Sequence, residues 1–275
     1  MAQVLEYTGM PAGKWFIPPP PQLIKDAWML VVGYKAAPDA LRAVLPPGLE
    51  PHPNGLVQMN MYDVPDANQT SGFGPYSLTY LTVEIAGHDS LAADGSMRIP
   101  GRYFAYYWNS SDVVRAYARE AGGIPALPGS CSWERGGGKL ASILRVAREP
   151  VITATVGITE NYLMTLGGHL NYYAHRQFPL PEGGGAALSE LLEFPIPFVA
   201  ELYEARVEDV EFSFPDGEPA AALAPLRPLE VPSVLYGKVT FTYSMARRIR
   251  DYLADEEVHG TRRPDPRDGR RQKGS

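Results

Sequence analysis

The sequence predicts a β-rich α+β fold, in which many short strands form sheets that close or sandwich and only a few short helices occur. Two observations support this prediction. Gly and Pro number 27 each in 275 residues, about a fifth of the chain against an average of roughly 12%, which indicates many turns. The remaining stretches are short runs that are apolar or alternating and rich in Val, Thr and Tyr, which is typical of strands rather than helices.

The runs that predict strands are spread over the whole chain. They are expected at 28–35, 56–64, 76–85, 102–108, 139–146, 151–159, 162–166, 167–178, 202–214 and 233–243, with a loop at 87–100. In the second of these runs the alternation puts Gln58, Asn60 and Tyr62 on one face. Residues 139–159 predict a hairpin.

Three short helices are expected. One covers 38–45, with Pro38 near its start, and another, at 245–253, is amphipathic. The third lies in the segment 108–133, where a serine cap precedes a helix that breaks at Gly122-Gly123. On a helical wheel its apolar residues share one side, and Arg119 falls on the opposite, solvated side.

Composition restricts the partners and the compartment. A net charge of −6 argues against nucleic acid as a partner, and no run of 18 apolar residues predicts a membrane span. A single cysteine and the absence of a recognisable signal peptide favour a cytoplasmic protein. We expect a Pro-rich arm at 1–26, one domain at 27–254 and a charged, disordered tail at 255–275.

Common cofactor and catalytic motifs are missing from the sequence. There is no phosphate-binding loop, dinucleotide fingerprint, HExxH or CxxC, and Gly129-Ser130-Cys131-Ser132-Trp133 lacks the second glycine of a nucleophile elbow. His169 and His175 would share a face of a strand, but no third ligand accompanies them. We therefore expect neither a cofactor nor a metal.

Several segments, in this order, resemble the acetoacetate decarboxylase family. They are DALRAVLPPGLEP, TSGFGPY, VVRAYAREAGGIP, LNYYAHR, LAPLRPLEVPSVLYG and RRIRDYL, within residues 27–253. The resemblance implies a curved antiparallel sheet or cone-shaped barrel, an interior pocket for a small-molecule substrate, and a homo-oligomer. It also implies a lysine that forms a Schiff base with a ketone.

The chain departs from that family at the implied catalytic positions. Arg119 stands in place of the Schiff-base lysine and Glu120 in place of its lysine neighbour, and a guanidinium cannot form the imine. Asn60 and Leu78 occupy two glutamate positions, and an arginine position falls near Ala27. The resemblance therefore predicts the fold but argues against classical decarboxylation.

Three functions are compatible with these substitutions. The first is lyase, isomerase or cyclase chemistry on a hydrophobic keto or β-keto compound, with Arg119 holding an oxygen and Glu120 as general base. Its pocket would be lined by Asn60, Tyr62, Tyr76, Leu78 and Tyr103. The second is a non-catalytic binder with the same cavity. The third is a decarboxylase with a relocated lysine: Lys35, Lys139 or Lys238.

Overall fold

A computed structural model describes residues 22–65, 73–91 and 98–258. The strands lie in one sheet in the order β11-β9-β10-β1-β2-β3-β4-β8-β7-β6, and β5 pairs with β4. Their bounds are β1 Gln22–Lys35, β2 Leu56–Val64, β3 Tyr76–Leu91, β4 Arg98–Asn109, β5 Ala126–Pro128, β6 Ser130–Gly136, β7 Lys139–Val146, β8 Glu149–Pro179, β9 Ala186–Ser213, β10 Glu230–Tyr243 and β11 Arg247–Asp251. The helices are α1 Pro38–Ala43, α2 Asp112–Glu120 and α3 Tyr252–Val258, with a 3₁₀ helix η2 at Ala220–Leu226.

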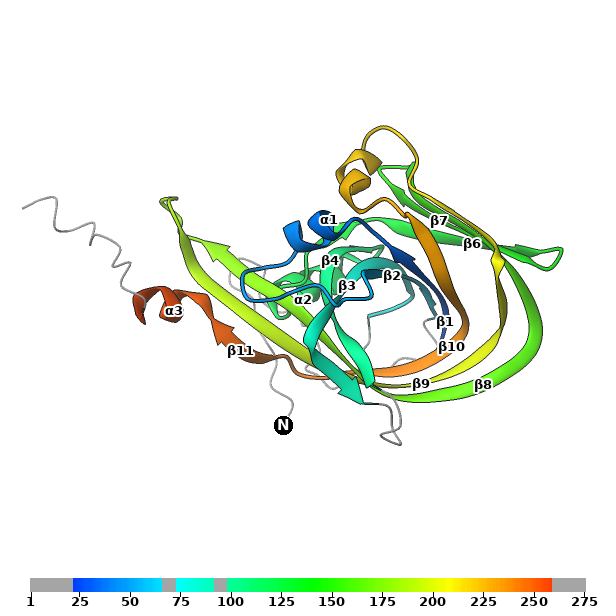
Figure 1. Cartoon of the computed structure of the whole chain (residues 1–275), viewed down its shortest axis with the longest axis horizontal. Coiled ribbons are helices and arrows are strands. Elements are labelled where there is room, and N and C mark those ends of the chain that lie inside the picture. The colour runs from blue at the N-terminus through cyan, green and yellow to red at the C-terminus, as the bar shows by residue number, and fades with distance from the viewer. Residues whose placement is uncertain (1–21, 66–72, 92–97, 259–275) are drawn as a thin grey trace, which may run out of the picture.

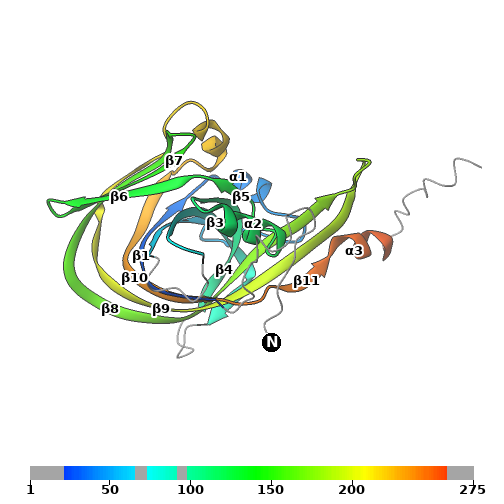
Figure 2. The same cartoon turned by 180° about the vertical axis from the view of Figure 1, so that it is seen from behind.

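The sheet curves until it closes on itself, as Figures 1 and 2 show. The long strand β8 makes this closure possible, because it pairs antiparallel with β9 along most of its length and also parallel with β4. The β4 pairing is short and joins Arg102 and Tyr103 to Tyr172 and Tyr173. The result is a cone-shaped barrel of β9, β10, β1, β2, β3, β4 and β8.

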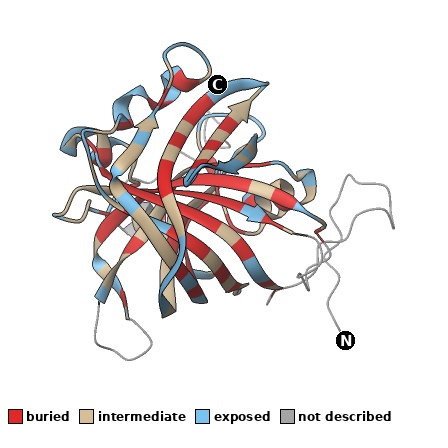
Figure 3. Ribbon diagram, turned by 90° about the vertical axis from the view of Figure 1, so that its right-hand side faces the viewer, coloured by how far each residue is buried: buried red, intermediate tan, exposed pale blue. Residues whose placement is uncertain are grey.

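Two large apolar cores lie on opposite faces of this curved sheet. The first fills the barrel and includes Met29, Tyr62, Tyr80, Phe104 and Phe241. The second lies behind β1–β3, where the β6–β7–β8 part of the sheet and η2 cover alternate residues such as Leu30, Met59 and Leu81. Strands buried on both faces explain the near-continuous apolar run at 28–34, and Figure 3 shows the buried residues in red along the strands.

Most of the expected strands and the hairpin at 139–159 are confirmed, as are helices α1 and α2. Ser111 caps α2, because its side chain accepts a hydrogen bond from the Val114 N–H. The runs 162–166 and 167–178 belong to the single strand β8. The strand expected from residue 28 begins at Gln22, so that the end of the predicted Pro-rich arm belongs to β1.

Two predictions of local structure are wrong. The loop expected at 87–100 is strand at both ends, since β3 runs to Leu91 and β4 starts at Arg98. The helix expected at 245–253 is instead strand β11 followed by α3. Pairing with the edge of β9 overrides the helical pattern there, because Arg247 and Arg248 meet the buried carboxylates of Glu193 and Glu190. Residues 255–258 of the predicted disordered tail belong to α3. The remaining residues of the predicted arm and tail lie outside the described part of the chain.

Candidate ligand-binding cavity

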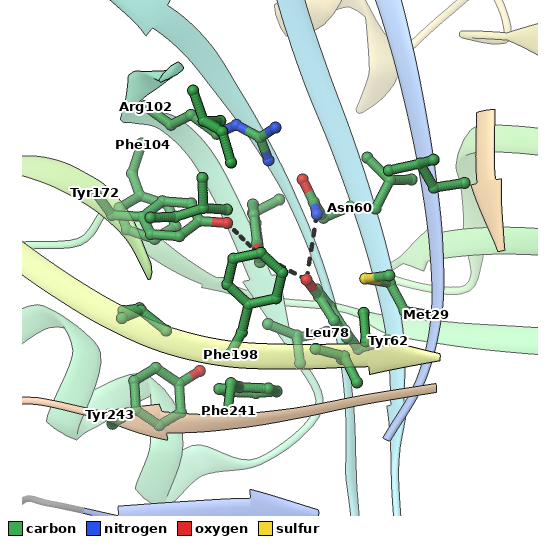
Figure 4. Close-up of a pocket in the computed structure, with 18 of the residues that line it drawn as sticks. Met29, Asn60, Tyr62, Leu78, Arg102, Phe104, Tyr172, Phe198, Phe241 and Tyr243 are labelled. Carbon is green, nitrogen blue, oxygen red and sulfur yellow. Dashed lines mark hydrogen bonds between the residues drawn. The ribbon is translucent and has the colours of Figure 1, made fainter. Parts of the chain in front are cut away.

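The barrel encloses a cavity of about 110 Å³. Its walls come from β1–β4 on one side and from β8, β9 and β10 on the other, as Figure 4 shows for the labelled residues. Most of the described lining residues are apolar, and they include Met29, Val31, Leu78, Ile99, Phe104, Leu170, Ile196, Phe198, Val239 and Phe241. Such an apolar cavity with a few converging polar groups is typical of a small-molecule site.

A chain of hydroxyl groups crosses the cavity wall. Asn60 Nδ2 donates to the Tyr62 hydroxyl (3.2 Å), the Tyr62 and Tyr80 hydroxyls lie 3.2 Å apart, and the Tyr80 and Tyr172 hydroxyls are also 3.2 Å apart. Burial raises the pKa of Tyr62 and that of Tyr80 well above the ordinary value of a phenol. These phenols are therefore neutral near pH 7 and act as hydrogen-bond donors rather than as bases.

Arg102 contributes the charge of the cavity. Among the described lining residues it is the only side chain that is charged at neutral pH. Its Nη2 lies 4.0 Å from Oε1 of the buried Glu84, whose carboxylate also accepts a hydrogen bond from Gln58 Nε2 at 2.7 Å. Glu84 thus balances the charge of the guanidinium, and Figure 4 shows Arg102 and Asn60 among the residues around the pocket.

Two buried polar atoms of this cavity have no hydrogen-bond partner among the described residues. They are Nε of Arg102, a donor, and Oδ1 of Asn60, an acceptor. A buried polar group without a partner costs about 1–3 kcal/mol, and native structures contain few of them. The residues that line this cavity thus include one unpaired donor and one unpaired acceptor.

Strand alternation explains why these residues meet. On β2 and β3 the cavity-facing positions are two residues apart, so that Asn60 and Tyr62 lie beside Tyr80 and Leu78. On β4 the register shifts between the pairs Leu81–Tyr106 and Thr82–Phe104, which leaves Ala105 as an extra residue. This bulge lets Phe104 and Tyr107, three residues apart, face the same cavity.

A second cavity, of about 170 Å³, adjoins the first. It lies against the apolar face of α2 and against residues 243–246, and five residues line both cavities: Phe104, Tyr107, Ile124, Ile196 and Tyr243. We call the cavity that contains Arg102 the inner cavity and the one beside α2 the outer cavity.

Three of the predicted lining residues line the inner cavity: Asn60, Tyr62 and Leu78. Tyr76 is buried in the same core but lines neither cavity. Tyr103 faces the other side of β4, where it packs with Leu49, Tyr173 and Tyr252. Burial raises the pKa of Tyr103 to about 12.

Arg119 and Glu120 lie outside both cavities. Arg119 is exposed, and its Nη1 donates to the carbonyl of Ala126 at 3.1 Å. Glu120 is half-buried at the last turn of α2. The opposite face of the helix, with Val114, Tyr117 and Ala118, lines the outer cavity, as the helical wheel predicts. The catalytic role of Arg119 and Glu120 stays a prediction that these side-chain positions do not support.

Arg102, Tyr80 and Tyr172 line the inner cavity but are not among the residues predicted from the sequence. The signal was present for Arg102, a single charge at the start of the apolar run RYFAYYW, since a charge inside a buried strand needs a partner. Tyr80 and Tyr172 offered no such signal, because buried tyrosines are ordinary in strands.

The described lysines lie away from the inner cavity. Lys35 Nζ pairs with Glu230 at 2.8 Å, and Lys238 Nζ lies 5.1 Å from the ring centre of Trp28. Lys139 lines a groove that also contains Trp28 and Arg135, behind the barrel wall. No lysine is among the described residues that line the inner cavity. Nor do three His, Cys, Asp or Glu side chains gather in the described ranges as a potential metal site.

The described residues form a closed, cone-shaped barrel around an apolar cavity with one arginine, so the protein is a β-rich α+β protein with an interior pocket. The family model of acetoacetate decarboxylase (ADC) matches residues 7–253. The chain therefore belongs to the acetoacetate decarboxylase family. None of the described helices is long and apolar enough to cross a membrane.

Solved structures with this fold include an acetoacetate decarboxylase from Legionella pneumophila, with 18% identity and a TM-score of 0.73 over 90% of this chain and 94% of that one. The enduracididine biosynthesis enzyme MppR in complex with pyruvate has 19% identity and a TM-score of 0.66 over 91% of this chain and 100% of that one. An acetoacetate decarboxylase-like enzyme from Sphingomonas wittichii RW1 has 18% identity and a TM-score of 0.60 over 84% and 94%. No curated protein matches the sequence. At these identities the likeness shows the fold alone.

Proposed function

We propose that the protein is an enzyme that binds a small hydrophobic keto or β-keto compound and performs lyase, isomerase or cyclase chemistry without a Schiff base. The observation that carries this proposal is that Arg102 and the hydroxyl chain Tyr62–Tyr80–Tyr172 line the same apolar cavity. A structural neighbour in complex with pyruvate supports a keto acid as the kind of ligand.

The chemistry follows from where negative charge would develop. When a water molecule from the solvent takes the proton from the carbon beside a ketone, the C–H electrons form a carbon–carbon double bond and the carbonyl electrons move onto oxygen. A guanidinium and neutral phenols in an apolar cavity stabilise that oxygen. Enolisation, dehydration, isomerisation and cyclisation of keto compounds can each pass through such an enolate, and none of these reactions needs an imine.

Proton exchange tests this proposal. We expect the protein to accelerate deuterium incorporation at C3 of phenylpyruvate in D₂O, measured by NMR. In Arg102→Met this exchange rate should be lower by at least about 100-fold, the range seen when one oxyanion donor is removed. Equal exchange by both proteins would contradict the assignment of Arg102. Borohydride added with the keto acid should leave the protein mass unchanged; a covalent adduct would support the relocated lysine instead.

A non-catalytic binder is the second candidate, and one observation favours it. The described residues that line the inner cavity include no carboxylate and no histidine, so a general base is not evident. This candidate would be supported over the enzyme by two results. The wild type should bind phenylpyruvate in calorimetry without accelerating its deuterium exchange, and Arg102→Met should no longer bind it. A homo-oligomer, a cytoplasmic location and the absence of a cofactor stay predictions.

A further inference from the structure

The outer cavity directly adjoins the inner one. Five residues border both, and Figure 4 places one of them, Tyr243, at the end of the pocket opposite Arg102. The outer walls are formed by Phe73, Val114, Tyr117, Ala118, Phe194 and Met245, with no charged side chain among the described lining residues. The positive charge is therefore confined to the inner cavity, at Arg102.

The two volumes suit two parts of one ligand. An apolar cavity of about 150 Å³ holds a molecule of the size of benzene. The outer cavity, at about 170 Å³, is large enough for an aromatic ring or a short alkyl chain. The inner cavity, at about 110 Å³, is smaller and suits a head group of a few heavy atoms.

Small residues at the C-terminal end of α2 keep the outer cavity open. Ala118, which is 5% exposed, and the half-buried Ala121 both line it, at positions where a larger aliphatic residue would fill the space. Next to them, a Cβ atom on Gly122 would lie 2.8 Å from the Ala118 carbonyl oxygen and 3.2 Å from Cζ of Phe194. The chain at Gly122 is thus packed tightly against Phe194 of β9, while the small side chains of Ala118 and Ala121 leave the volume of the outer cavity unfilled.

We infer that the outer cavity binds the apolar end of the substrate, and that Ala118 and Ala121 determine how large this end can be. The substrate is then an amphipathic keto acid whose carboxylate or keto oxygen meets Arg102 and whose ring or alkyl group lies against α2. This inference rests on the proposed function for the position of the head group.

Pyruvate and phenylpyruvate test the inference, because they share the keto acid head and differ by a phenyl group. Calorimetry of the full chain should show that phenylpyruvate binds at least about tenfold more tightly than pyruvate, since even one methylene in an apolar pocket contributes about tenfold or more. Ala118→Leu should remove this preference and leave the affinity for pyruvate within about twofold.

Ala116→Leu is the matched control, because Ala116 lies on the same helix, is half-buried and lines neither cavity. This variant should keep the tenfold preference. If Ala118→Leu does not fold, as judged by circular dichroism, Ala121→Leu makes the same test at a less buried position.

The outcomes separate the inference from the proposed function. Two results overturn the outer subsite and leave Arg102 as the head-group site. One is equal affinity of the wild type for both acids. The other is a preference for phenylpyruvate over pyruvate that survives Ala118→Leu or Ala121→Leu. Loss of both acids in Arg102→Met supports that head-group site. If Arg102→Met binds both acids as tightly as the wild type does, the proposed function is overturned and, with it, the assignment of the outer cavity.

Discussion

Tyr80 occupies the middle of the hydroxyl chain, with a partner 3.2 Å away on each side. Tyr80→Phe removes both hydrogen bonds and leaves Tyr62 and Tyr172 without this shared partner. A typical hydrogen bond contributes about 1 kcal/mol, so we expect the free energy of unfolding in urea to fall by roughly 1–2 kcal/mol. The keto acid exchange rate should also fall.

Tyr34 provides a control for this substitution. It is fully buried in the second core, and its hydroxyl has no hydrogen-bond partner among the described residues. Tyr34→Phe removes an unpaired polar group and should leave the free energy of unfolding unchanged or slightly higher. An equal loss in both variants would mean that the Tyr62–Tyr80–Tyr172 chain contributes no specific stability.

Glu120 offers a contrast, because its side chain lies outside both cavities. Glu120→Gln keeps the size of the side chain and removes its capacity as a base. From the position of the residue we expect the exchange rate of phenylpyruvate to stay within about twofold of the wild type. A loss comparable with that of Arg102→Met, about 100-fold, would restore Glu120 as a catalytic base and move the reacting atoms toward the end of α2.

At the scale of elements, strand β11 is held to β9 by charged side chains. Glu193, which is 5% exposed, accepts hydrogen bonds from Arg247 Nε and from the Tyr173 hydroxyl, the latter at 2.6 Å. Beside it, Glu190 pairs with Arg176 at 2.6 Å and with Arg248 at 3.0 Å. Burial alone would raise the pKa of Glu193, but the hydrogen bonds from Arg247 and Tyr173 outweigh it, so that the pKa is lowered.

The lowered pKa of Glu193 predicts acid sensitivity. A carboxylate whose pKa is lower in the folded state stabilises the protein above its unfolded pKa of about 4.3, and this contribution is lost as the pH falls through the folded pKa. We expect Arg247→Gln to reduce the free energy of unfolding at pH 7 and to converge on the wild type as the pH drops below about 4. Urea unfolding at several pH values measures the difference.

Arg98→Gln is the control for this pH series. Arg98 is 79% exposed and its Nη1 lies 3.9 Å from Asp89, and surface pairs of this kind contribute little. It should match the wild type at every pH. A difference between Arg247→Gln and the wild type that does not change with pH would contradict the role assigned to Glu193.

The same strand shows how far the sequence predicts this structure. Local signals were sufficient where an element depends on its own residues: Ser111 and the spacing of Val114, Tyr117 and Ala118 predict α2 and its buried face. At 247–251 the helical period is also present, but the pairing partners lie on β9, more than fifty residues earlier. Such non-local pairing has no local signature, so the pattern predicts the wrong element.

The candidate site was predictable to the extent that its residues lie on one strand. The alternation of β2 predicts that Asn60 and Tyr62 share a face, and both line the inner cavity. Arg102 and Tyr172 meet only because β4 and β8 pair at that point to close the barrel, a consequence of the whole sheet. The resemblance placed catalysis on α2, whereas barrel closure puts the cationic end of the cavity on β4.

At the scale of the whole molecule, a ligand in the inner cavity contacts strands from both sides of the closure. The lining residues come from β1, β2, β3 and β4 and, across the cavity, from β8, β9 and β10. A ligand that binds only the folded protein stabilises it by about 2.7 kcal/mol at 100 times its dissociation constant. For a chain of this size each kcal/mol raises the melting temperature by about 2–4 °C.

We therefore expect phenylpyruvate at that concentration to raise the melting temperature by about 5–10 °C, measured by scanning calorimetry. The increase should grow with the logarithm of the ligand concentration, because the stabilisation follows mass action. Arg102→Met, heated with the same acid, should show no increase, since the proposed binding mode places the carboxylate or keto oxygen of the acid against this guanidinium. An equal increase in both proteins would place binding elsewhere, for instance in the groove beside Trp28 and Arg135, and would remove the link between barrel closure and ligand binding.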